Sequence, residues 1–419
     1  MDAYTKSGLE IGLASQARGC QHGPAIAALT DGGFIATWTC LSGAMGEASG
    51  ADVRAGLFGG ARPARGDFLV NTRLLDHQQG AAVTGLGDGG FAIAWEDYGV
   101  PNGPSVKAKV FGPDAAVIAD EFPVDPKARG EQSCPAVAAL ADGFVVAWQQ
   151  DTGRRGGTDV WLALFNADGT RVGRPLPVSE ATAGYQASPA VAALGDGGFV
   201  VAWQDFSGRG GDRSASGVKA RLFGPDAEPW GPEFLVNTEI WNDQALPAVT
   251  GLGDGGFAVA WTCYSGRGGD GSGTGIKARL FSAAGEPRGD EFLVNTETLN
   301  SQVSPALAGL GDGGLVVTWT CYSGRGADRS GASIKAKVFN ADGSVAADEF
   351  LANTATEGDQ TASAVAALPE GGFVVAWQCA GGRLGGATAV KAQVFSPTRL
   401  PLLASAGRDR PAEDRSRAA

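Results

Sequence analysis

The chain contains the stretch Gln244-Ala-Leu-Pro-Ala-Val-Thr-Gly-Leu-Gly-Asp-Gly-Gly-Phe-Ala-Val-Ala-Trp261. A short run of small apolar residues precedes the Asp-Gly-Gly, and a second, β-prone run follows it. An Asp-Gly pair between two such runs is the strongest short-range sign of a β-hairpin, because both turn residues tolerate a positive φ. The stretch therefore predicts two antiparallel strands joined by a tight turn.

The same stretch recurs seven times. Its tryptophan returns with a period of about 55 residues, and a fixed period of this length means that one supersecondary unit is repeated through the chain. A glutamine precedes each tryptophan by the interval that separates Gln244 from Trp261, shortened by one position in the third copy. The tryptophans are Trp38, Trp95, Trp148, Trp203, Trp261, Trp319 and Trp377, and the glutamines are Gln21, Gln78, Gln132, Gln186, Gln244, Gln302 and Gln360.

Two further segments complete each repeat. A glycine-rich loop after the tryptophan leads to a segment of alternating polar and apolar residues, such as Ile276 to Phe281, which predicts a strand nearer to solvent. A turn then leads to a fourth segment, for which Glu291-Phe-Leu-Val-Asn-Thr296 is typical. No helical periodicity is present. Four antiparallel strands in each of seven repeats predict an all-β fold, a seven-bladed β-propeller.

The two ends of the chain distinguish a closed ring from a stacked solenoid. The last repeat stops after its third strand at Phe395, while Glu10-Ile-Gly-Leu-Ala-Ser15 precedes Gln21 by the same interval that separates Glu291 from Gln302. We therefore expect the N-terminal strand to complete the last blade, an arrangement for which a solenoid has no use. The predicted organisation is an N-terminal tail over 1–9, the propeller over 10–396 and a disordered C-terminal tail over 397–419.

Composition limits the classes of function. The 419 residues are 43% hydrophobic, and the 66 glycines fall mostly at fixed places in the repeat, as turn residues. The net charge of −12 argues against binding to nucleic acid or to an anionic membrane, whose partners are basic, and fits divalent cations or neutral glycans. The sequence has no apolar run long enough to span a membrane, so we expect no membrane insertion. The segment from Met1 to Cys20 has no apolar core of a conventional signal peptide.

Residues that recur in every blade are expected to serve the blade itself. The tryptophan and phenylalanine of the second strand should fill the wedge between neighbouring blades, and the small residues of the first strand should line the crowded axis. Each glutamine is expected to hydrogen-bond loop backbone between the outer strand of one blade and the next blade. Function should then lie where the blades differ, and the loop after the second strand is the best candidate.

Three positions in this loop contain side chains that are able to bind a ligand. An aromatic residue three positions after the tryptophan, an arginine six after it and a carboxylate nine after it are able to grip a sugar, and are equally able to form a clamp in which arginine pairs with the carboxylate and stacks on the ring. The aromatic residues are Tyr98, Phe206, Tyr264 and Tyr322, the arginines are Arg209, Arg267 and Arg325, and the carboxylates are Asp212, Asp270 and Asp328.

Calcium and catalysis are the other possibilities for these loops. The carboxylates Asp212, Asp270 and Asp328 are candidate ligands for a hard cation such as calcium, although one carboxylate per loop is few. Catalysis has less support, because the two histidines, His22 and His77, lie in different blades and no Gly-x-Ser-x-Gly elbow is present. A glycosidase pair of carboxylates contributed by different blades remains open.

Six cysteines remain. Four of them, Cys40, Cys263, Cys321 and Cys379, occupy the second position after a tryptophan, and Cys20 and Cys134 flank a glutamine. A disulfide between Cys20 and Cys40 is conceivable at the ends of paired strands. The others have no evident partner, and most of the cysteines are expected to be small buried hydrophobic residues.

The repeat units Glu-Phe-Leu-Val-Asn-Thr and Gln-x-x-Pro-Ala-Val-Ala-x-Leu-x-Asp-Gly-Gly-Phe-Val-Val-x-Trp resemble a repeat of large secreted bacterial proteins, among them hemolysin-type (RTX) calcium-binding proteins and surface adhesins of proteobacteria. The resemblance extends from Glu10 to about Phe395. It implies an extracellular or cell-surface location, export without a conventional signal peptide, and a role in attachment. The chain differs from those proteins in lacking the calcium-binding nonapeptide array.

These observations lead to one main hypothesis and two alternatives. The main hypothesis is a non-enzymatic recognition or adhesion module that binds a glycan or a cell-surface protein through the loops after the second strands. The first alternative is a calcium-associated structural module of an exported protein. The second is a propeller glycosidase or lyase.

Overall fold

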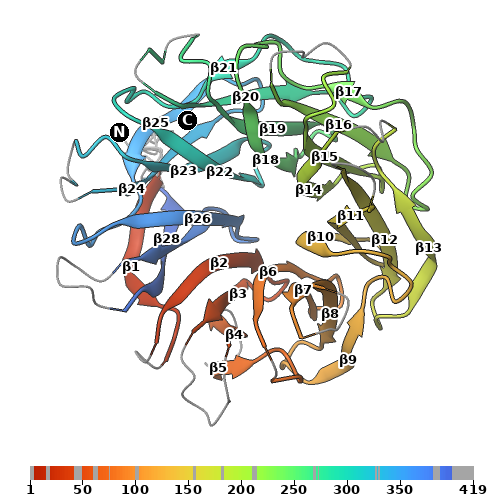
Figure 1. Ribbon diagram of the computed structural model, residues 1–419. Helices are drawn as coiled ribbons and strands as arrows, with labels where there is room; N and C mark the ends of the chain where they lie inside the picture. Colours follow the sequence, from red (N-terminus) through yellow and green to blue (C-terminus); the bar gives the residue numbers. More distant parts are fainter. Residues whose placement is uncertain are drawn as a thin grey trace, which may run out of the picture.

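The structure is a computed structural model. It describes residues 4–15, 19–41, 50–59, 65–74, 76–99, 103–153, 157–180, 184–209, 215–267, 270–271, 273–325, 328, 331–380 and 387–398. Over these ranges the chain forms seven four-stranded antiparallel sheets arranged in a ring, which confirms the predicted seven-bladed β-propeller (Figure 1). None of the described segments is a helix long and apolar enough to cross a membrane.

Each blade begins at the axis with the strand that starts at the repeated glutamine. From the axis outward, blade 1 contains β2 (Gln21–Ala28), β3 (Gly33–Cys40), β4 (Asp52–Gly59) and β5 (Arg65–Leu69). Blade 2 contains β6 (Gln78–Gly85), β7 (Phe91–Asp97), β8 (Ser105–Phe111) and β9 (Val117–Pro123). Blade 3 contains β10 (Gln132–Leu140), β11 (Gly143–Asp151), β12 (Thr158–Asn166) and β13 (Arg171–Pro177).

The remaining blades follow the same order. Blade 4 contains β14 (Gln186–Ala193), β15 (Phe199–Asp205), β16 (Gly217–Phe223) and β17 (Phe234–Leu235). Blade 5 contains β18 (Gln244–Gly251), β19 (Phe257–Cys263), β20 (Gly275–Phe281) and β21 (Phe292–Leu293). Blade 6 contains β22 (Gln302–Gly309), β23 (Leu315–Cys321), β24 (Ser333–Phe339) and β25 (Val345–Leu351), and blade 7 contains β26 (Gln360–Ala367), β27 (Phe373–Cys379), β28 (Ala389–Pro397) and β1 (Tyr4–Gly12).

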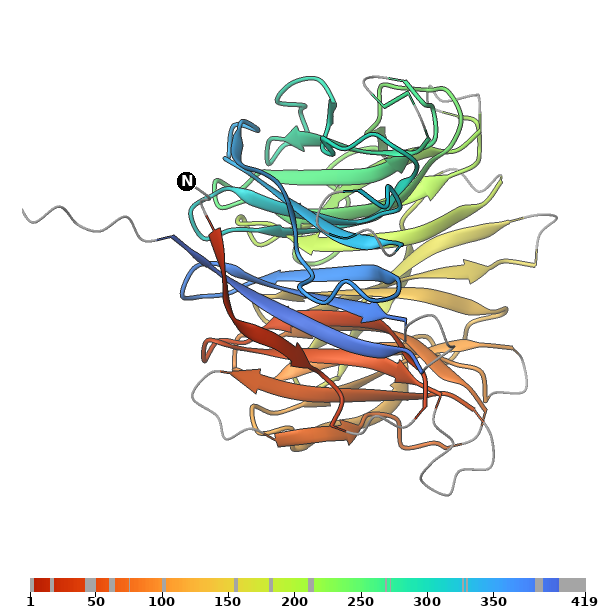
Figure 2. The ribbon, with the colours of Figure 1, turned by 90° about the vertical axis from the view of Figure 1, so that its left-hand side faces the viewer.

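The N-terminal strand closes the ring, as the sequence predicts. β1 pairs antiparallel with β28, so that Tyr4 lies opposite Pro397 and Gly12 lies opposite Lys391 (Figure 2). Glu10 occupies the place of Glu291 in the repeat and pairs with Lys391, with 3.0 Å between Oε2 and Nζ. The strand begins at Tyr4, so most of the predicted 1–9 tail belongs to it. The predicted C-terminal tail lies outside the described residues from position 399 onward.

The Asp-Gly-Gly turn uses its three residues in three different ways. In blade 5 the Asp254 carboxylate accepts the N–H of Gly256 at 3.0 Å, and Gly255 has a φ of 88°. A Cβ on Gly256 would lie 2.4 Å from the carbonyl oxygen of Phe281, which leaves no room for any other residue. The first glycine thus supplies the left-handed conformation, and the second allows the close approach of the third strand.

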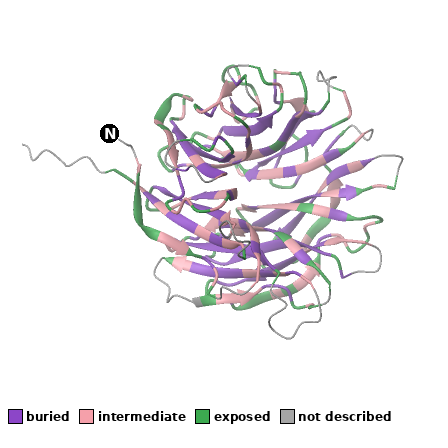
Figure 3. Cartoon of the chain, turned by 60° about the vertical axis from the view of Figure 1, so that its left-hand side comes forward, coloured by how far each residue is buried: buried purple, intermediate pink, exposed green. Residues whose placement is uncertain are grey.

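The core lies between blades. All seven repeated tryptophans have an exposed fraction of 0%, which confirms that they fill the wedges. In one such wedge Val53 and Leu57 of β4 pack against Phe91 and Trp95 of β7, so the core residues come from two neighbouring sheets. Figure 3 shows the buried residues concentrated on the strands and the exposed ones at their ends.

The third strands are more buried than their alternating sequence predicts. In β20 every residue except Arg279 is buried, and Lys277 is 5% exposed. The lysine is tolerated because its Nζ lies 2.6 Å from Oε1 of Glu291 on the segment that contains β21. β20 is thus nearer to solvent than the fully buried β19, as predicted, but only at Arg279, because Lys277 is covered by its ion pair with the outermost part of the blade.

Candidate functional site

One end of the ring carries the connections after the second strands and those that lead into the next blade; we call this end the loop face. On it, each residue three positions after a tryptophan is fixed by a backbone hydrogen bond. The N–H of Tyr264 donates to the carbonyl of Asp243 at 2.9 Å, and that of Phe206 donates to the carbonyl of Tyr185 at 2.8 Å. The bond ties the start of the loop to the residue that precedes the glutamine of the same blade.

Exposed aromatic side chains gather on the loop face. The side chains of Tyr98, Phe206, Tyr264 and Tyr322 are between 38% and 44% exposed, and Tyr185 and Trp241, in connections that lead into blades 4 and 5, are 52% and 55% exposed. Among the described residues, Trp230 is the one exposed aromatic residue placed elsewhere, since it packs beside Gly198 and Gly224 near the Asp-Gly-Gly turn of blade 4. Five of the six belong to the consecutive blades 4, 5 and 6, which we call the aromatic arc: Tyr185, Phe206, Trp241, Tyr264 and Tyr322.

The three loops of the aromatic arc share one local conformation. In blade 5 the hydroxyl of Ser265 accepts the N–H of Arg267 at 3.1 Å, and Gly266 between them has a φ of 61°. The same bond and the same glycine conformation occur in the other two loops, between Ser207 and Arg209 at 3.2 Å with Gly208 at 64°, and between Ser323 and Arg325 at 3.3 Å with Gly324 at 59°. The serine-capped turn and the left-handed glycine therefore present three arginines in the same way.

Arg267 stacks on Trp241. Its guanidinium carbon lies 4.3 Å from the centre of the indole ring, within the range of a cation–π contact. In the clamp predicted from the sequence, the arginine stacks on the tyrosine of its own loop. In the structure Arg267 instead stacks on Trp241, which lies in the connection that leads into blade 5. Trp241 does not belong to the repeated pattern, so the search for recurring residues missed it. Its position just before the repeated Gln244 could have marked it as a loop-face residue.

The predicted carboxylates do not reach the surface of the arc. Asp270 is 2% exposed and accepts a hydrogen bond from Nδ2 of Asn295 at 3.0 Å, and Asp328 is 1% exposed and accepts one from Nδ2 of Asn353 at 2.9 Å. The predicted grip of aromatic ring, arginine and carboxylate on one sugar is therefore wrong for these two loops. Asp212 lies outside the described residues.

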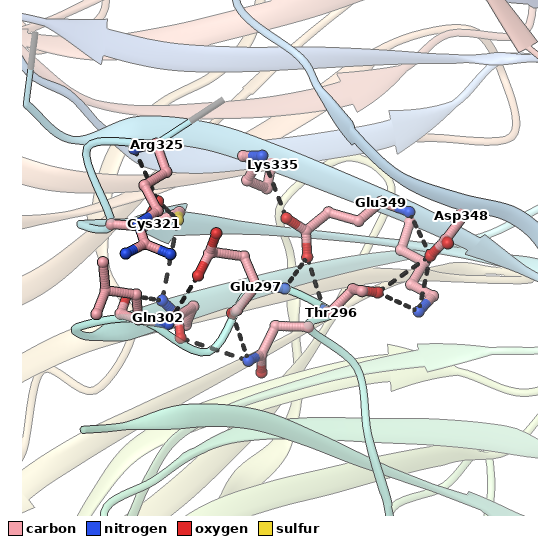
Figure 4. A network of polar contacts seen from close by, with 12 residues as sticks. Thr296, Glu297, Gln302, Cys321, Arg325, Lys335, Asp348 and Glu349 are labelled. Atoms are coloured by element: carbon pink, nitrogen blue, oxygen red, sulfur yellow. Dashed lines mark hydrogen bonds and ion pairs between the residues drawn. The ribbon is translucent and has the colours of Figure 1, made fainter. Parts of the chain in front are cut away.

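The expected hydrogen bond from the glutamine to loop backbone is confirmed in blades 5, 6 and 7. Nε2 of Gln302 donates to the carbonyl of Leu299 at 3.0 Å, and its Oε1 lies 3.4 Å from Nδ2 of Asn295 (Figure 4). Oδ1 of Asn295 accepts the N–H of Ile276 at 2.8 Å. Glutamine, asparagine and buried aspartate thus hold together the third strand, the outer strand and the connection to the next blade.

Blade 2 carries a different polar cluster. The hydroxyl of Tyr98 donates to Oε2 of Glu96 at 3.0 Å, and Oε1 accepts the N–H of Cys134 in blade 3 at 2.7 Å. Burial, followed by the neighbouring Glu96 carboxylate, raises the pKa of Tyr98. In the other blades the residue after the tryptophan is threonine or glutamine, and Thr262 caps the N–H of Ser304 in the same manner at 3.1 Å. Glu96 therefore supports the backbone of the next blade.

The remaining candidates form no reactive centre among the described residues. His22 is half-buried, and burial lowers its pKa. Cys20 and Cys40 are not joined by a disulfide. The thiols of Cys263 and Cys321 are buried as expected, whereas Cys134 is exposed and Cys379 is half-buried, so the expectation of burial was wrong for these two. No group of three or more histidine, cysteine, aspartate or glutamate residues in the described ranges is arranged to hold a metal ion.

The opposite end of the central channel is a hollow of about 670 Å³. Small and aliphatic residues of the first strands and their turns line it, among them Ala138, Ala192, Gly251 and Leu310. No charged side chain of the described residues belongs to this lining. The hydroxyls of Thr84 and Thr250 are the polar side-chain groups of this described lining, which contains no carboxylate, histidine or cysteine, and the loop face remains the candidate site.

No protein-family model and no curated protein sequence matches the chain. Solved structures do share its fold. A protein of unknown function from Dyadobacter fermentans has a TM-score of 0.57 at 11% identity, covering 95% of this chain and 100% of that one. The GH93 α-L-arabinofuranosidase of Fusarium graminearum with arabinobiose has a TM-score of 0.51 at 11% identity, covering 94% and 98%. The NanB sialidase from Streptococcus pneumoniae has a TM-score of 0.51 at 9% identity, covering 94% and 70%.

Proposed function

We propose that this propeller is a non-enzymatic recognition module that binds carbohydrate on the aromatic arc. The observation that carries the proposal is the gathering of Tyr185, Phe206, Trp241, Tyr264 and Tyr322 on one face of three consecutive blades. Aromatic faces stack on the C–H surface of sugar rings, and exposed contiguous apolar patches mark interaction sites. The glycan-active enzymes among the structures of similar fold agree with this ligand class.

Polar groups beside the rings add hydrogen-bonding capacity. Nδ2 of Asn242 donates to the carbonyl of Tyr264 at 3.1 Å, and that of Asn300 donates to the carbonyl of Tyr322 at 3.2 Å, so each ring is held beside an exposed amide. The loops are also held by their serine-capped turns, which reduces the conformational entropy that a ligand must remove on binding. We place the protein outside the cell or at its surface, in keeping with the resemblance of its repeat to those of secreted proteins and adhesins.

Binding to a glycan array tests the proposal. The variants Tyr264→Ala and Tyr322→Ala should each weaken binding about fivefold, the equivalent of roughly 1 kcal/mol for a lost ring contact. Tyr264→Phe, which keeps the ring, should bind nearly as well as the wild type. Trp230→Ala removes an exposed ring away from the loop face and is the matched control.

The same experiment separates the alternatives. A calcium-associated structural module would bind no glycan and would melt at a lower temperature in a chelator. A cell-surface protein as ligand would give binding to cells that persists after enzymatic removal of their glycans. Release of reducing sugar from a bound polysaccharide would identify a glycosidase and contradict the non-enzymatic proposal.

A further inference from the structure

The three loops of the aromatic arc repeat one pair of groups in three consecutive blades. Each loop presents an exposed aromatic ring and, three positions later, an exposed arginine whose N–H is held by the serine between them. A surface that repeats the same groups at the spacing of its blades suits a ligand that repeats its own units. A polymer fits this description better than a single small sugar, because it engages several equivalent contacts at once.

Among the described residues of the three loops of the aromatic arc, the exposed charged side chains are arginines, although the chain as a whole carries −12. Arg209, Arg267 and Arg325 are exposed, whereas Asp270 and Asp328 are buried against asparagine side chains. Among the described residues, the ion pairs of blades 4 to 6 include none of these three arginines.

Three carboxylates in the neighbouring connections, those of Glu239, Asp243 and Glu297, are held by hydrogen bonds to nearby backbone and hydroxyl groups. The half-buried carboxylates of Glu239 and Glu297 accept the N–H groups of Trp241 at 3.0 Å and Leu299 at 2.9 Å, two positions further along. Asp243 accepts both the N–H and the hydroxyl of Ser216. Glu239 and Glu297 therefore cap their own connections, and Asp243 joins its connection to the residue that precedes β16.

The geometry of Arg267 suits an anionic group. Stacking on Trp241 at 4.3 Å leaves the N–H groups at the edges of the guanidinium plane available, and this edge matches a carboxylate or sulfate with two parallel hydrogen bonds. We infer that the glycan bound by the aromatic arc is an acidic polysaccharide, with sugar rings on the aromatic residues and uronate or sulfate groups on Arg209, Arg267 and Arg325. This inference rests on the proposed function and specifies its ligand class.

The test compares polygalacturonate with its fully methyl-esterified form, in which the sugars are the same and the charge is gone. Polygalacturonate, alginate and chondroitin sulfate provide acidic probes, and dextran and arabinan provide neutral ones. We expect at least one acidic polymer to bind, and raising the ionic strength from about 0.05 M to about 0.5 M to weaken that binding at least tenfold, because exposed ion pairs are screened. For polygalacturonate, esterification should weaken binding to a similar extent.

Variants locate the effect. The triple variant Arg209→Gln, Arg267→Gln and Arg325→Gln should bind the acidic polymer at least about tenfold more weakly, since three exposed contacts are lost together. Arg174→Gln removes one exposed positive charge from β13 of blade 3 and should bind as the wild type does. Its melting temperature and that of the triple variant should match the wild type, which excludes unfolding as the cause.

The outcomes distinguish this inference from the proposal on which it rests. Binding of neutral polymers as tight as that of acidic ones, with no change in the triple variant, would overturn the anionic ligand and leave carbohydrate binding intact. Absence of binding to every polymer, acidic or neutral, would overturn both. Binding to acidic polymers that is lost equally in Arg174→Gln would show attraction without a site and would also overturn the inference.

Discussion

At the level of the residue, a single buried asparagine joins blade 5 to blade 6, and another joins blade 6 to blade 7. Asn295 is 3% exposed and uses one amide to accept the N–H of Ile276, to donate to Asp270 and to donate to the carbonyl of Glu297. Asn353 repeats the arrangement in blade 6, with Ile334, Asp328 and Gln360 as partners. A polar residue that is buried and hydrogen-bonded on every side stabilises one arrangement of the connection over all others.

Removal of this amide should destabilise the fold. We expect Asn295→Ala to lower the free energy of unfolding by about 2–4 kcal/mol, because the N–H of Ile276 loses its acceptor and the buried Asp270 carboxylate loses a donor. Urea denaturation measures the change. Asn340→Ala is the control, because Asn340 lies exposed in a turn, and it should change the free energy of unfolding by less than about 0.5 kcal/mol. Equal stability of Asn295→Ala and the wild type would contradict the assigned role.

The first strands contain residues with a positive φ, and these show why some structural details of single residues could not be predicted from the sequence. In each blade the second residue after the glutamine has a positive φ and interrupts the pairing with the second strand. Glycine fills this position in blades 1 and 2, but Leu246 adopts a φ of 52° and Ala362 one of 54°. Neither residue favours such a conformation, so no local preference predicts the bulge. Contacts from the preceding blade compensate, as when Thr320 accepts the N–H of Ala362 at 3.2 Å.

At the level of the element, a glutamate beside the fourth strand contacts both the third strand of its blade and the preceding connection. We call this arrangement the latch. Oε1 of Glu291 pairs with Lys277 at 2.6 Å, while its Oε2 accepts the N–H of Thr238 from the preceding connection at 2.6 Å. Glu349 repeats the latch with Lys335 and Thr296, as Figure 4 shows. The short outer strands β17 and β21 therefore depend on side-chain contacts as well as on their few ladder bonds.

This latch should make stability depend on pH. Burial alone would raise the pKa of Glu291, but the hydrogen bond from Lys277 and those from the Thr238 and Glu239 amides outweigh it and hold that pKa below its ordinary value. A carboxyl group whose pKa is lowered by folding stabilises the fold above its unfolded pKa, about 4.3 for glutamate, and loses that effect as the pH falls through the folded pKa. The pKa values of Glu10 and Asp97 are lowered in the same direction.

The variant Glu291→Gln tests the latch. At pH 7 it should lower the free energy of unfolding by roughly 2 kcal/mol, because Lys277 loses the charge of its partner in a largely buried place. The difference from the wild type should shrink below about pH 4, where the wild-type carboxylate also becomes protonated. Glu286→Gln, in an exposed turn, is the control. A difference that stays constant from neutral to strongly acidic pH would show that Glu291 acts through its shape alone.

Elements were easier to predict than the site they carry. The hairpins follow from Asp-Gly-Gly and its flanking apolar runs, and the ring follows from their count and from the displaced N-terminal strand. The buried position of Asp270 depends on Asn295, far along the chain on another segment, and the stacking of Arg267 depends on Trp241, which no repeat marks. Local sequence patterns predict hydrogen bonds between residues a few positions apart. The contacts of Asp270 and Arg267 join residues that are farther apart in the sequence and form only once the blade has assembled.

The whole molecule is held closed by one strand borrowed from the far end of the chain. Gln393 of β28 donates to the carbonyl of Ser7, and Lys6 of β1 donates to the carbonyl of Asn353 in the preceding blade at 2.9 Å. Without β1 the outer edge of β28 and the apolar residues beneath it, Val394 and Phe395 among them, would face solvent. An exposed strand edge of this kind pairs readily with other chains.

A circular permutation tests whether closure needs the strand or its position in the chain. Deletion of the segment 1–15 should lower the melting temperature by about 10 °C or more and promote aggregation, because an entire edge strand is lost. Tyr4 and Pro397 lie opposite each other, so a short turn such as Asn-Ala-Asp-Gly can join the end of β28 to the start of β1. A chain that begins at position 19, continues through β28 and ends with the segment 4–15 after this turn should melt within a few degrees of the wild type. Equal loss of stability in the deletion and the permuted chain would show that the link from β1 to β2, rather than the strand itself, closes the ring.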